Sequence, residues 1–171
     1  MSSSAAETFA EAYDNGYVTL YFTNKEVYMS EGNGALSMAT ISGGVVGDFS
    51  IVTDDAEVLS VDGSTLYYAS GSYQNNDVTY CDLYSCNNGT STRMARDVIL
   101  NNINLYGDGV ILAYTGYRSY SGFELTMINA KGETTLIGDN VTQYIRVDKS
   151  TLLYISDGDL YSYNGKEKKM V

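Results

Sequence analysis

The carboxylates are the side chains in this sequence with the clearest potential for chemistry. Asp54-Asp55 and the pair Asp157 and Asp159 are close in sequence, and two carboxyl groups roughly 5–9.5 Å apart carry out glycoside hydrolysis. Both pairs fall in predicted turns, where Asp is favoured because it hydrogen-bonds its own backbone. Asp157-Gly158-Asp159 also matches the start of a calcium loop, but the other ligands of that loop are missing. We therefore expect turn residues here, with no catalytic or metal-binding role.

Other residue types exclude several classes of enzyme. The 171 residues contain no His, which is the usual base of serine and cysteine hydrolases. The sequence also has no nucleophile elbow, no Walker loop and no dinucleotide-binding fingerprint. Cys81 and Cys86 fall in one predicted strand, too far apart for a disulfide, and are expected to be buried free thiols. The sequence predicts a protein that is not an enzyme and uses no cofactor.

Two polar stretches, 71–77 and 116–122, carry the side chains best suited to binding. Both are predicted to be loops between the second and third strands of neighbouring units, and such loops emerge on one face. The predicted binding residues are Tyr73, Gln74, Asn75, Asn76, Tyr117, Arg118 and Tyr120. Tyr and Arg are common anchors of protein contacts, and Tyr beside Asn or Gln also suits sugars. The predicted partner is therefore a protein or a glycan.

The elements that position these loops recur with a period of about 42 residues. Four tyrosines, spaced by 40, 46 and 40 residues, are predicted to lie in the core: Tyr28, Tyr68, Tyr114 and Tyr154. Four acidic residues that precede a new strand have spacings of 40, 43 and 42: Asp14, Asp54, Asp97 and Asp139. Strand signals at this period are typical of four-stranded propeller blades. The expected fold is all-β and β-propeller-like, with four repeats in residues 14–171.

Strand and turn signals give each unit its elements. The first unit is predicted to hold strands at 17–22, 26–30, 35–41 and 49–53, and the second at 57–61, 65–70, 78–86 and 92–96. The third is predicted to hold strands at 103–106, 110–115, 123–128 and 134–137, and the fourth at 143–147, 151–156, 159–163 and 168–171. Residues 1–13 are expected to be a short helix with a capping box at Ser4 and Glu7, or a linker remnant.

The charge distribution limits the partners. The net charge of −11 argues against nucleic acid, whose phosphates require Lys and Arg. No apolar run reaches 18 residues, so membrane insertion is not expected. Residues 1–60 hold one base and nine acids, whereas residues 146–171 hold five bases and four acids. Such an asymmetry favours attraction within one chain or between chains.

Four phrases of the sequence resemble a known repeat family. VDGSTLYYAS, DLYSCNNG, VDKSTLLYIS and GDLYSYNGKEKK resemble the bacterial TolB-like and low-density-lipoprotein-receptor-like propeller repeats across residues 14–171. The resemblance implies a disc of six to eight blades that contacts proteins or glycans without catalysis, outside the cytoplasm or at the cell surface.

Four units are fewer than such a ring holds, which leaves three arrangements. They are a closed four-blade disc, an open arc, and a half-ring that a second copy completes as a homo-oligomer. The expected function is a binding or scaffold module for protein–protein or cell-envelope contacts. The alternative is a lectin-like propeller, and a third reading is a propeller-type glycoside hydrolase.

Overall fold

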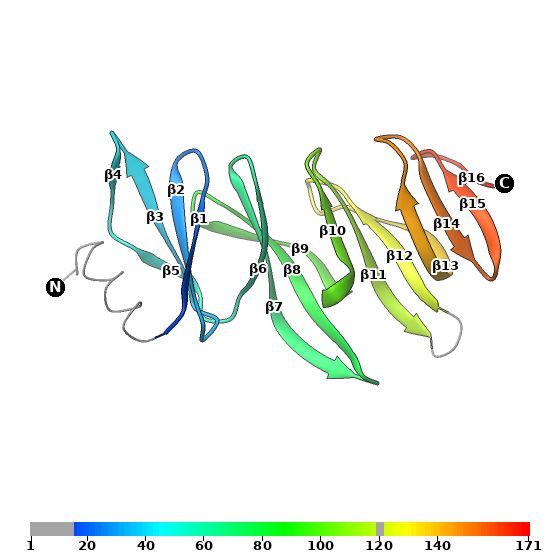
Figure 1. The fold of residues 1–171 in the computed structure, drawn as a ribbon, viewed down its shortest axis with the longest axis horizontal. Coiled ribbons are helices and arrows are strands. Elements are labelled where there is room, and N and C mark those ends of the chain that lie inside the picture. Colours follow the sequence, from blue (N-terminus) through cyan, green and yellow to red (C-terminus); the bar gives the residue numbers. More distant parts are fainter. Residues whose placement is uncertain (1–15, 119–121) are drawn as a thin grey trace. The chain divides into compact units, whose positions relative to one another are not determined.

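The computed structural model describes residues 16–118 and 122–171, and β strands dominate it (Figure 1). The only helical element in this part of the chain is a 3₁₀ turn, η1 (Leu100–Asn102). No helix in the described part is long and apolar enough to cross a membrane. The helix predicted in residues 1–13 lies outside the described residues. The all-β class is therefore shown.

Antiparallel meanders build the first two sheets. The first has the order β1-β2-β3-β4 with β5 also paired to β3, and its strands are β1 (Val18–Phe22), β2 (Glu26–Glu31), β3 (Leu36–Ser42), β4 (Val45–Val46) and β5 (Ser50–Thr53). The second has the order β6-β7-β8-β9, and its strands are β6 (Glu57–Asp62), β7 (Thr65–Asn75), β8 (Val78–Asn87) and β9 (Thr90–Ile99). Each sheet thus corresponds to one predicted repeat.

The third sheet has seven strands and joins the last two repeats. Its order follows the chain: β10 (Ile103–Tyr106), β11 (Val110–Arg118), β12 (Gly122–Ile128), β13 (Thr134–Arg146), β14 (Leu152–Ser156), β15 (Asp159–Tyr163) and β16 (Lys168–Met170). We predicted separate strands at 134–137 and 143–147, but β13 runs through both and the prediction of a break was wrong. The strand continues because Asn140 adopts a left-handed φ of 50° and the register shifts between Val141 and Gln143.

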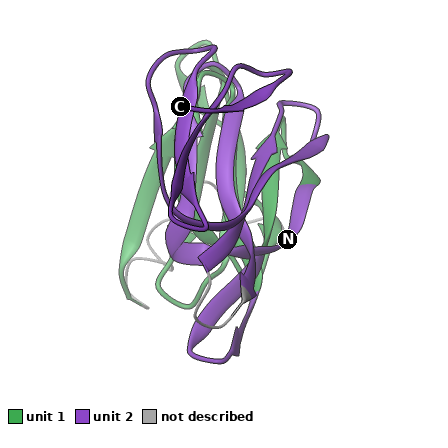
Figure 2. Cartoon of the chain, turned by 90° about the vertical axis from the view of Figure 1, so that its right-hand side faces the viewer, with its two compact units in different colours: residues 1–71, 82–93 green, residues 72–81, 94–171 purple. Residues whose placement is uncertain are grey.

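The chain divides into two compact units (Figure 2). In the described part of the chain, unit 1 comprises residues 16–71 and 82–93, and unit 2 comprises residues 72–81, 94–118 and 122–171. Strands β7, β8 and β9 contribute residues to both units. That residues 14–171 form one four-blade body stays a prediction.

The four repeated tyrosines are all buried, which confirms their predicted place in the core. Tyr28 and Tyr68 belong to one hydrophobic cluster, in unit 1, and Tyr114 and Tyr154 belong to another, in unit 2. Buried phenols need hydrogen-bond partners. The Tyr68 hydroxyl lies 2.9 Å from Ser91 Oγ, and the Tyr154 hydroxyl donates to the Ile137 carbonyl at 3.3 Å. Each core therefore contains a tyrosine whose ring packs among apolar side chains and whose hydroxyl group has a hydrogen-bond partner.

Both cysteines lie on β8 as buried free thiols, as predicted. Cys86 packs in the unit 1 core, where its Sγ accepts a hydrogen bond from the Tyr28 hydroxyl at 3.6 Å. The Cys81 thiol donates to the Val98 carbonyl at 3.6 Å. These contacts give each thiol a structural role.

Candidate functional site

The first predicted loop is the end of a β-hairpin. Strand β7 continues to Asn75 and β8 begins at Val78, so only Asn76 and Asp77 form the turn. Their φ angles of 49° and 61° are those of a type I′ hairpin turn. The prediction of a loop over 71–77 was therefore wrong. Gly71 takes a φ of +66° and its N–H donates to Asp55 Oδ2 at 2.7 Å. Because the backbone departs from strand geometry only at Gly71, β7 continues beyond it.

Tyr73 is the exposed aromatic residue of this hairpin. Its side chain remains 47% exposed although two neighbours hold it. The ring stacks on Tyr80, with centroids 5.4 Å apart, and its hydroxyl donates to Asp97 Oδ1 at 2.8 Å. Gln74 and Asn75 follow on β7 and are exposed, as is Asn76 in the turn. The hairpin therefore presents a braced phenol beside three carboxamides.

The second predicted loop also belongs largely to strands. Tyr117 pairs with Phe123, and Arg118 pairs with Gly122, across β11 and β12. The prediction of a loop over 116–122 was therefore wrong at 116–118 and at Gly122, because a register shift between Tyr114 and Gly116 lets β11 continue. Tyr117 is 37% exposed, and its ring lies 5.3 Å from that of Phe123. Tyr120 lies outside the described residues.

The two hairpin ends belong to the same unit. Residues 72–81 and the β11–β12 hairpin are both in unit 2, and both hairpins point to the lower side of Figure 1. Of the predicted binding residues, Tyr73, Gln74, Asn75 and Asn76 lie at the end of the β7–β8 hairpin. Tyr117 and Arg118 lie at the end of the β11–β12 hairpin. We name the two together the hairpin-end surface.

Sequence reasoning missed a cluster centred on Arg146. Its guanidinium donates two hydrogen bonds to Asp108, at 2.9 and 2.7 Å, and a third to the Lys149 carbonyl at 3.0 Å. It also lies 4.6 Å from the ring centroid of Tyr106, within range of a cation–π contact. Arg146 and Asp108 side chains are only 10% and 21% exposed. Because 38 residues separate the partners, no local pattern could have identified the pair.

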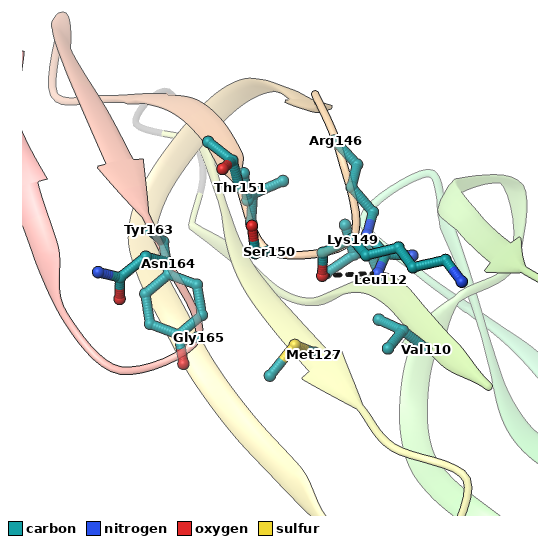
Figure 3. Close-up of a pocket in the computed structure, with 11 residues that line it drawn as sticks. Val110, Leu112, Met127, Arg146, Lys149, Ser150, Thr151, Tyr163, Asn164 and Gly165 are labelled. Carbon is teal, nitrogen blue, oxygen red and sulfur yellow. Dashed lines mark hydrogen bonds between the residues drawn. The ribbon is translucent and has the colours of Figure 1, made fainter. Parts of the chain in front are cut away.

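Two of the hollows that adjoin this cluster extend well beyond its residues. The first, of about 240 Å³, has an apolar floor and a polar rim (Figure 3) and is lined by Val110, Leu112, Met127, Arg146, Lys149, Ser150, Thr151, Leu152, Tyr163, Asn164 and Gly165. The second, broader, of about 500 Å³, is lined by Asn102, Asn104, Tyr106, Tyr114, Thr142, Gln143, Tyr144, Ile145 and Arg146. In the second, Asn104 donates to the Tyr144 hydroxyl, and burial raises the pKa of Tyr144 to about 12. Both hollows combine hydrogen-bonding groups with apolar or aromatic surface.

The carboxylates predicted to lie in turns accept hydrogen bonds from backbone and side-chain groups. Asp55 accepts hydrogen bonds from the Gly71 N–H and the Ser70 hydroxyl, and Asp157 adopts a left-handed φ of 52° and accepts from Asn140 Nδ2 at 2.9 Å. Asp157 lies in the turn between β14 and β15, as predicted, but both carboxylates accept hydrogen bonds from residues 15 to 17 positions away and not from their own turns. In the described part of the chain, no three acidic or Cys side chains lie close enough to hold a metal ion.

The Asp108–Arg146 pair predicts how the free energy of unfolding changes as the pH falls. The hydrogen bonds from Arg146 hold the pKa of the Asp108 carboxyl below its ordinary value, although partial burial acts the other way. A lowered pKa stabilises the fold above the ordinary carboxyl pKa of about 3.9, and this stability is lost as the pH falls through the lower folded-state pKa. We expect Asp108→Asn to lower the free energy of unfolding by about 1 kcal/mol at pH 7, and by nothing in acid below the folded-state pKa.

Urea unfolding at neutral pH and in acid measures this difference. Asp82→Asn is the matched control, because Asp82 pairs with Arg93 at 3.3 Å in a more exposed setting, and its effect should be smaller. A difference between Asp108→Asn and wild type that is the same at both pH values would contradict the role of the carboxylate charge.

Comparisons with known proteins reach the level of structure alone. No family model matches the chain, and no curated protein matches it by sequence. One similar solved structure is the β-propeller domain of the Trilobed protease from Pyrococcus furiosus, described as having an open velcro topology (TM-score 0.45, 14% identity, 90% of this chain and 54% of that chain). Another is the computationally designed Ika8 protein (TM-score 0.43, 12% identity, 90% of this chain and 48% of that chain). The chain thus spans about half the length of each, and the TolB-like resemblance stays a prediction.

Proposed function

We propose that this protein is a non-enzymatic binding module that contacts a protein partner through its hairpin-end surface. The observation that carries the proposal is the setting of Tyr73, which is half-exposed and yet fixed by Tyr80 and Asp97. A phenol held in place before binding loses little conformational freedom when a partner covers it. Fixed aromatic side chains of this kind dominate the energetics of protein interfaces.

The surroundings of Tyr73 support the same role. Asn75 is exposed on the same face of β7 as Tyr73, and Gln74 on the opposite face and Asn76 in the turn add further exposed donors and acceptors. Tyr117 adds a second half-exposed ring braced by Phe123. Large aromatic anchors among small polar groups are the usual composition of adaptable binding surfaces.

We also propose a four-blade arrangement and a location at the cell surface. The antiparallel meanders that recur at the repeat period support a four-blade, propeller-like arrangement. The partner is neither nucleic acid nor membrane lipid, in line with the net charge of −11. A position at the cell surface rests on the family resemblance, and oligomerisation follows if the four blades leave the ring incomplete.

A second candidate function is glycan binding, which one specific observation favours. The 500 Å³ hollow joins the carboxamides of Asn102, Asn104 and Gln143 with the rings of Tyr106 and Tyr144. Amides that hydrogen-bond hydroxyl groups beside aromatic surface suit a neutral sugar. In this reading the ligand lies in the hollow, and the hairpin ends contribute little.

A paired screen on wild type and variants separates the two functions. We expect a displayed peptide library to yield ligands whose binding falls at least about 30-fold in Tyr73→Ala, since anchors of this kind contribute about 2 kcal/mol or more. Tyr73→Phe keeps the ring and should lose less, whereas Tyr17→Ala, at the most exposed tyrosine of unit 1, should lose nothing. Peptide binding that Tyr73→Ala leaves intact would contradict the proposal.

A glycan array probed with the same proteins tests the alternative. Specific sugar binding that is lost in Gln143→Ala and kept in Tyr73→Ala would establish the glycan function in place of the peptide one. Glycosidase turnover that disappears on mutation of one carboxylate would overturn the non-enzymatic assignment.

A further inference from the structure

We infer that one face of the fourth repeat binds the same face of a second copy of this chain, in a two-fold symmetric dimer with antiparallel strands. Residues 143–146 of β13 form this repeat together with β14, β15 and β16, all in unit 2 (Figure 1). The face is separate from the hairpin-end surface, and the dimer does not require the function proposed for that surface. Three features support it: the burial pattern of β14, the apolar residues that this pattern leaves exposed, and opposite charges at the two ends of the repeat.

The strand that carries the repeated tyrosine is covered on one face only in the fourth repeat. Four consecutive residues are buried in the equivalent strands of the first three repeats: 26–29 in β2, 66–69 in β7 and 111–114 in β11. Since neighbouring residues of a strand point to opposite faces, these three strands are covered on both. In β14, Leu152 and Tyr154 are buried, whereas Leu153 and Ile155 are only half-buried. The face that carries Leu153 and Ile155 is therefore open.

This open face is rich in apolar side chains. Directly paired residues of neighbouring strands point to the same face. The register of β13 to β16 thus assigns the members of what we call the outer face: Gln143, Ile145, Leu153, Ile155, Leu160, Ser162 and Lys169. Ile145 is 62% exposed and Leu160 is 41% exposed. Because sheets bury such faces by packing on one another, a second sheet is the fitting partner.

Opposite charges at the two ends of the repeat select the partner and its orientation. At the end with the β14–β15 turn, the exposed charged residues are Asp139, Asp157 and Asp159. At the end with the β15–β16 turn, they are Lys149, Lys166, Lys168 and Lys169 together with Asp148 and Glu167. A second copy with antiparallel strands lays its basic end over the acidic end and its acidic end over the basic end. Two-fold symmetry forms both contacts at once, so the outer face is complementary to itself in charge.

The size of the outer face predicts a weak dimer. Four strands about 4.8 Å apart, each with about five residues that rise about 3.3 Å, cover roughly 300 Å². Specific interfaces bury about 800 Å² on each partner, and smaller ones belong to weak, transient complexes. We therefore expect a dissociation constant between about 10 μM and about 1 mM.

Sedimentation equilibrium over this concentration range measures the dimer. We expect a monomer–dimer equilibrium that Leu160→Glu and Ile145→Glu each abolish, because a glutamate on the outer face would be buried without a partner. Leu136→Glu is the matched control, since Leu136 is 54% exposed on β13 outside the outer face, and it should dimerise as wild type. Tyr73→Ala should do so too, which separates loss of the dimer from loss of binding at the hairpin-end surface. A wild-type monomer at about 1 mM, assembly beyond a dimer, or an equal loss in Leu136→Glu would overturn the inference.

Charge reversal tests the orientation. At low salt, Lys166→Glu and Asp159→Lys should each weaken the dimer at least about threefold, because each replaces two attractive contacts with repulsive ones. The double variant Lys166→Glu/Asp159→Lys exchanges the charges of the two ends and should recover the wild-type affinity to within about twofold. Single variants that dimerise more tightly than wild type would show that like ends meet. That result, or losses that simply add in the double variant, would overturn the antiparallel dimer.

Discussion

Raising the pH from about 9 to about 12 is expected to unfold this protein cooperatively, because its tyrosines resist ionisation in the folded state. The chain has 17 tyrosines, and burial raises the pKa of seven: Tyr28, Tyr67, Tyr68, Tyr106, Tyr114, Tyr144 and Tyr154. The pKa of Tyr144 reaches about 12. Unfolded tyrosines lose their protons near pH 10. The stability is therefore complete below about pH 10 and is lost as the pH rises toward the folded-state pKa values.

Tyrosinate absorbance and circular dichroism, followed in one alkaline titration, test this prediction. The part of the absorbance change that comes from the seven buried phenols should coincide with the loss of circular dichroism, since their ionisation requires unfolding. Tyr144→Phe should move the alkaline midpoint to higher pH, and Tyr17→Phe, at an exposed ring, should leave it unchanged. Full tyrosinate absorbance at about pH 10 with unchanged circular dichroism would contradict the role given to buried tyrosines.

Gly122→Ala is expected to lower the free energy of unfolding by about 3 kcal/mol. Gly122 begins β12 with a φ of +115°. A Cβ there would lie 2.7 Å from the carbonyl carbon of Asn140 and 2.9 Å from the carbonyl oxygen of Val141. Both are backbone atoms of the bend in β13, so neither can rotate away. The same change should weaken binding at the hairpin-end surface, because Gly122 pairs with Arg118 next to Tyr117.

Two glycines of the same unit serve as controls. A Cβ at Gly107 or at Gly158 would meet no atom within 4 Å, and Gly158 has a φ of +89°. Gly158→Ala should therefore cost about 1 kcal/mol from backbone strain alone, and Gly107→Ala close to nothing. If thermal or urea unfolding gives Gly122→Ala and Gly158→Ala free energies of unfolding within about 0.5 kcal/mol of each other, the backbone at the bend in β13 shifts to accept the methyl group. That result would contradict the prediction.

Local patterns in the sequence predicted most strands. Asp108-Gly109, Asp157-Gly158 and the alternation around them placed β10 at 103–106 and β15 at 159–163, as the structure has them. The reason is physical, since hairpin turns need left-handed backbone that Asp-Gly and Asn-Gly provide. The repeated tyrosines were likewise recognisable as core residues, because burial of a large aromatic ring recurs at one strand position in each repeat.

Polar strand ends and distant pairs escaped prediction. Residues 71–77 contain the Gly, Ser, Asn and Asp typical of loops, yet most continue β7 as an exposed two-stranded ribbon that requires no apolar alternation. Asp139-Asn140 similarly resembled a break, but Asn140 tolerates the left-handed conformation that lets β13 bend. The Arg146–Asp108 pair and the hollow beside it depend on strands from two repeats, which only the folded chain brings together.

We propose that the braced tyrosines of the hairpin-end surface provide most of the binding energy. The most direct measurement is the dissociation constant of a peptide selected on wild type, compared with the double variant Tyr73→Ala/Tyr117→Ala after circular dichroism shows that the variant is folded. Because each anchor contributes about 2 kcal/mol or more, the two together contribute about 4 kcal/mol, and we predict a complex that is weaker by about 700-fold. A folded double variant that binds within about twofold of wild type would contradict the claim.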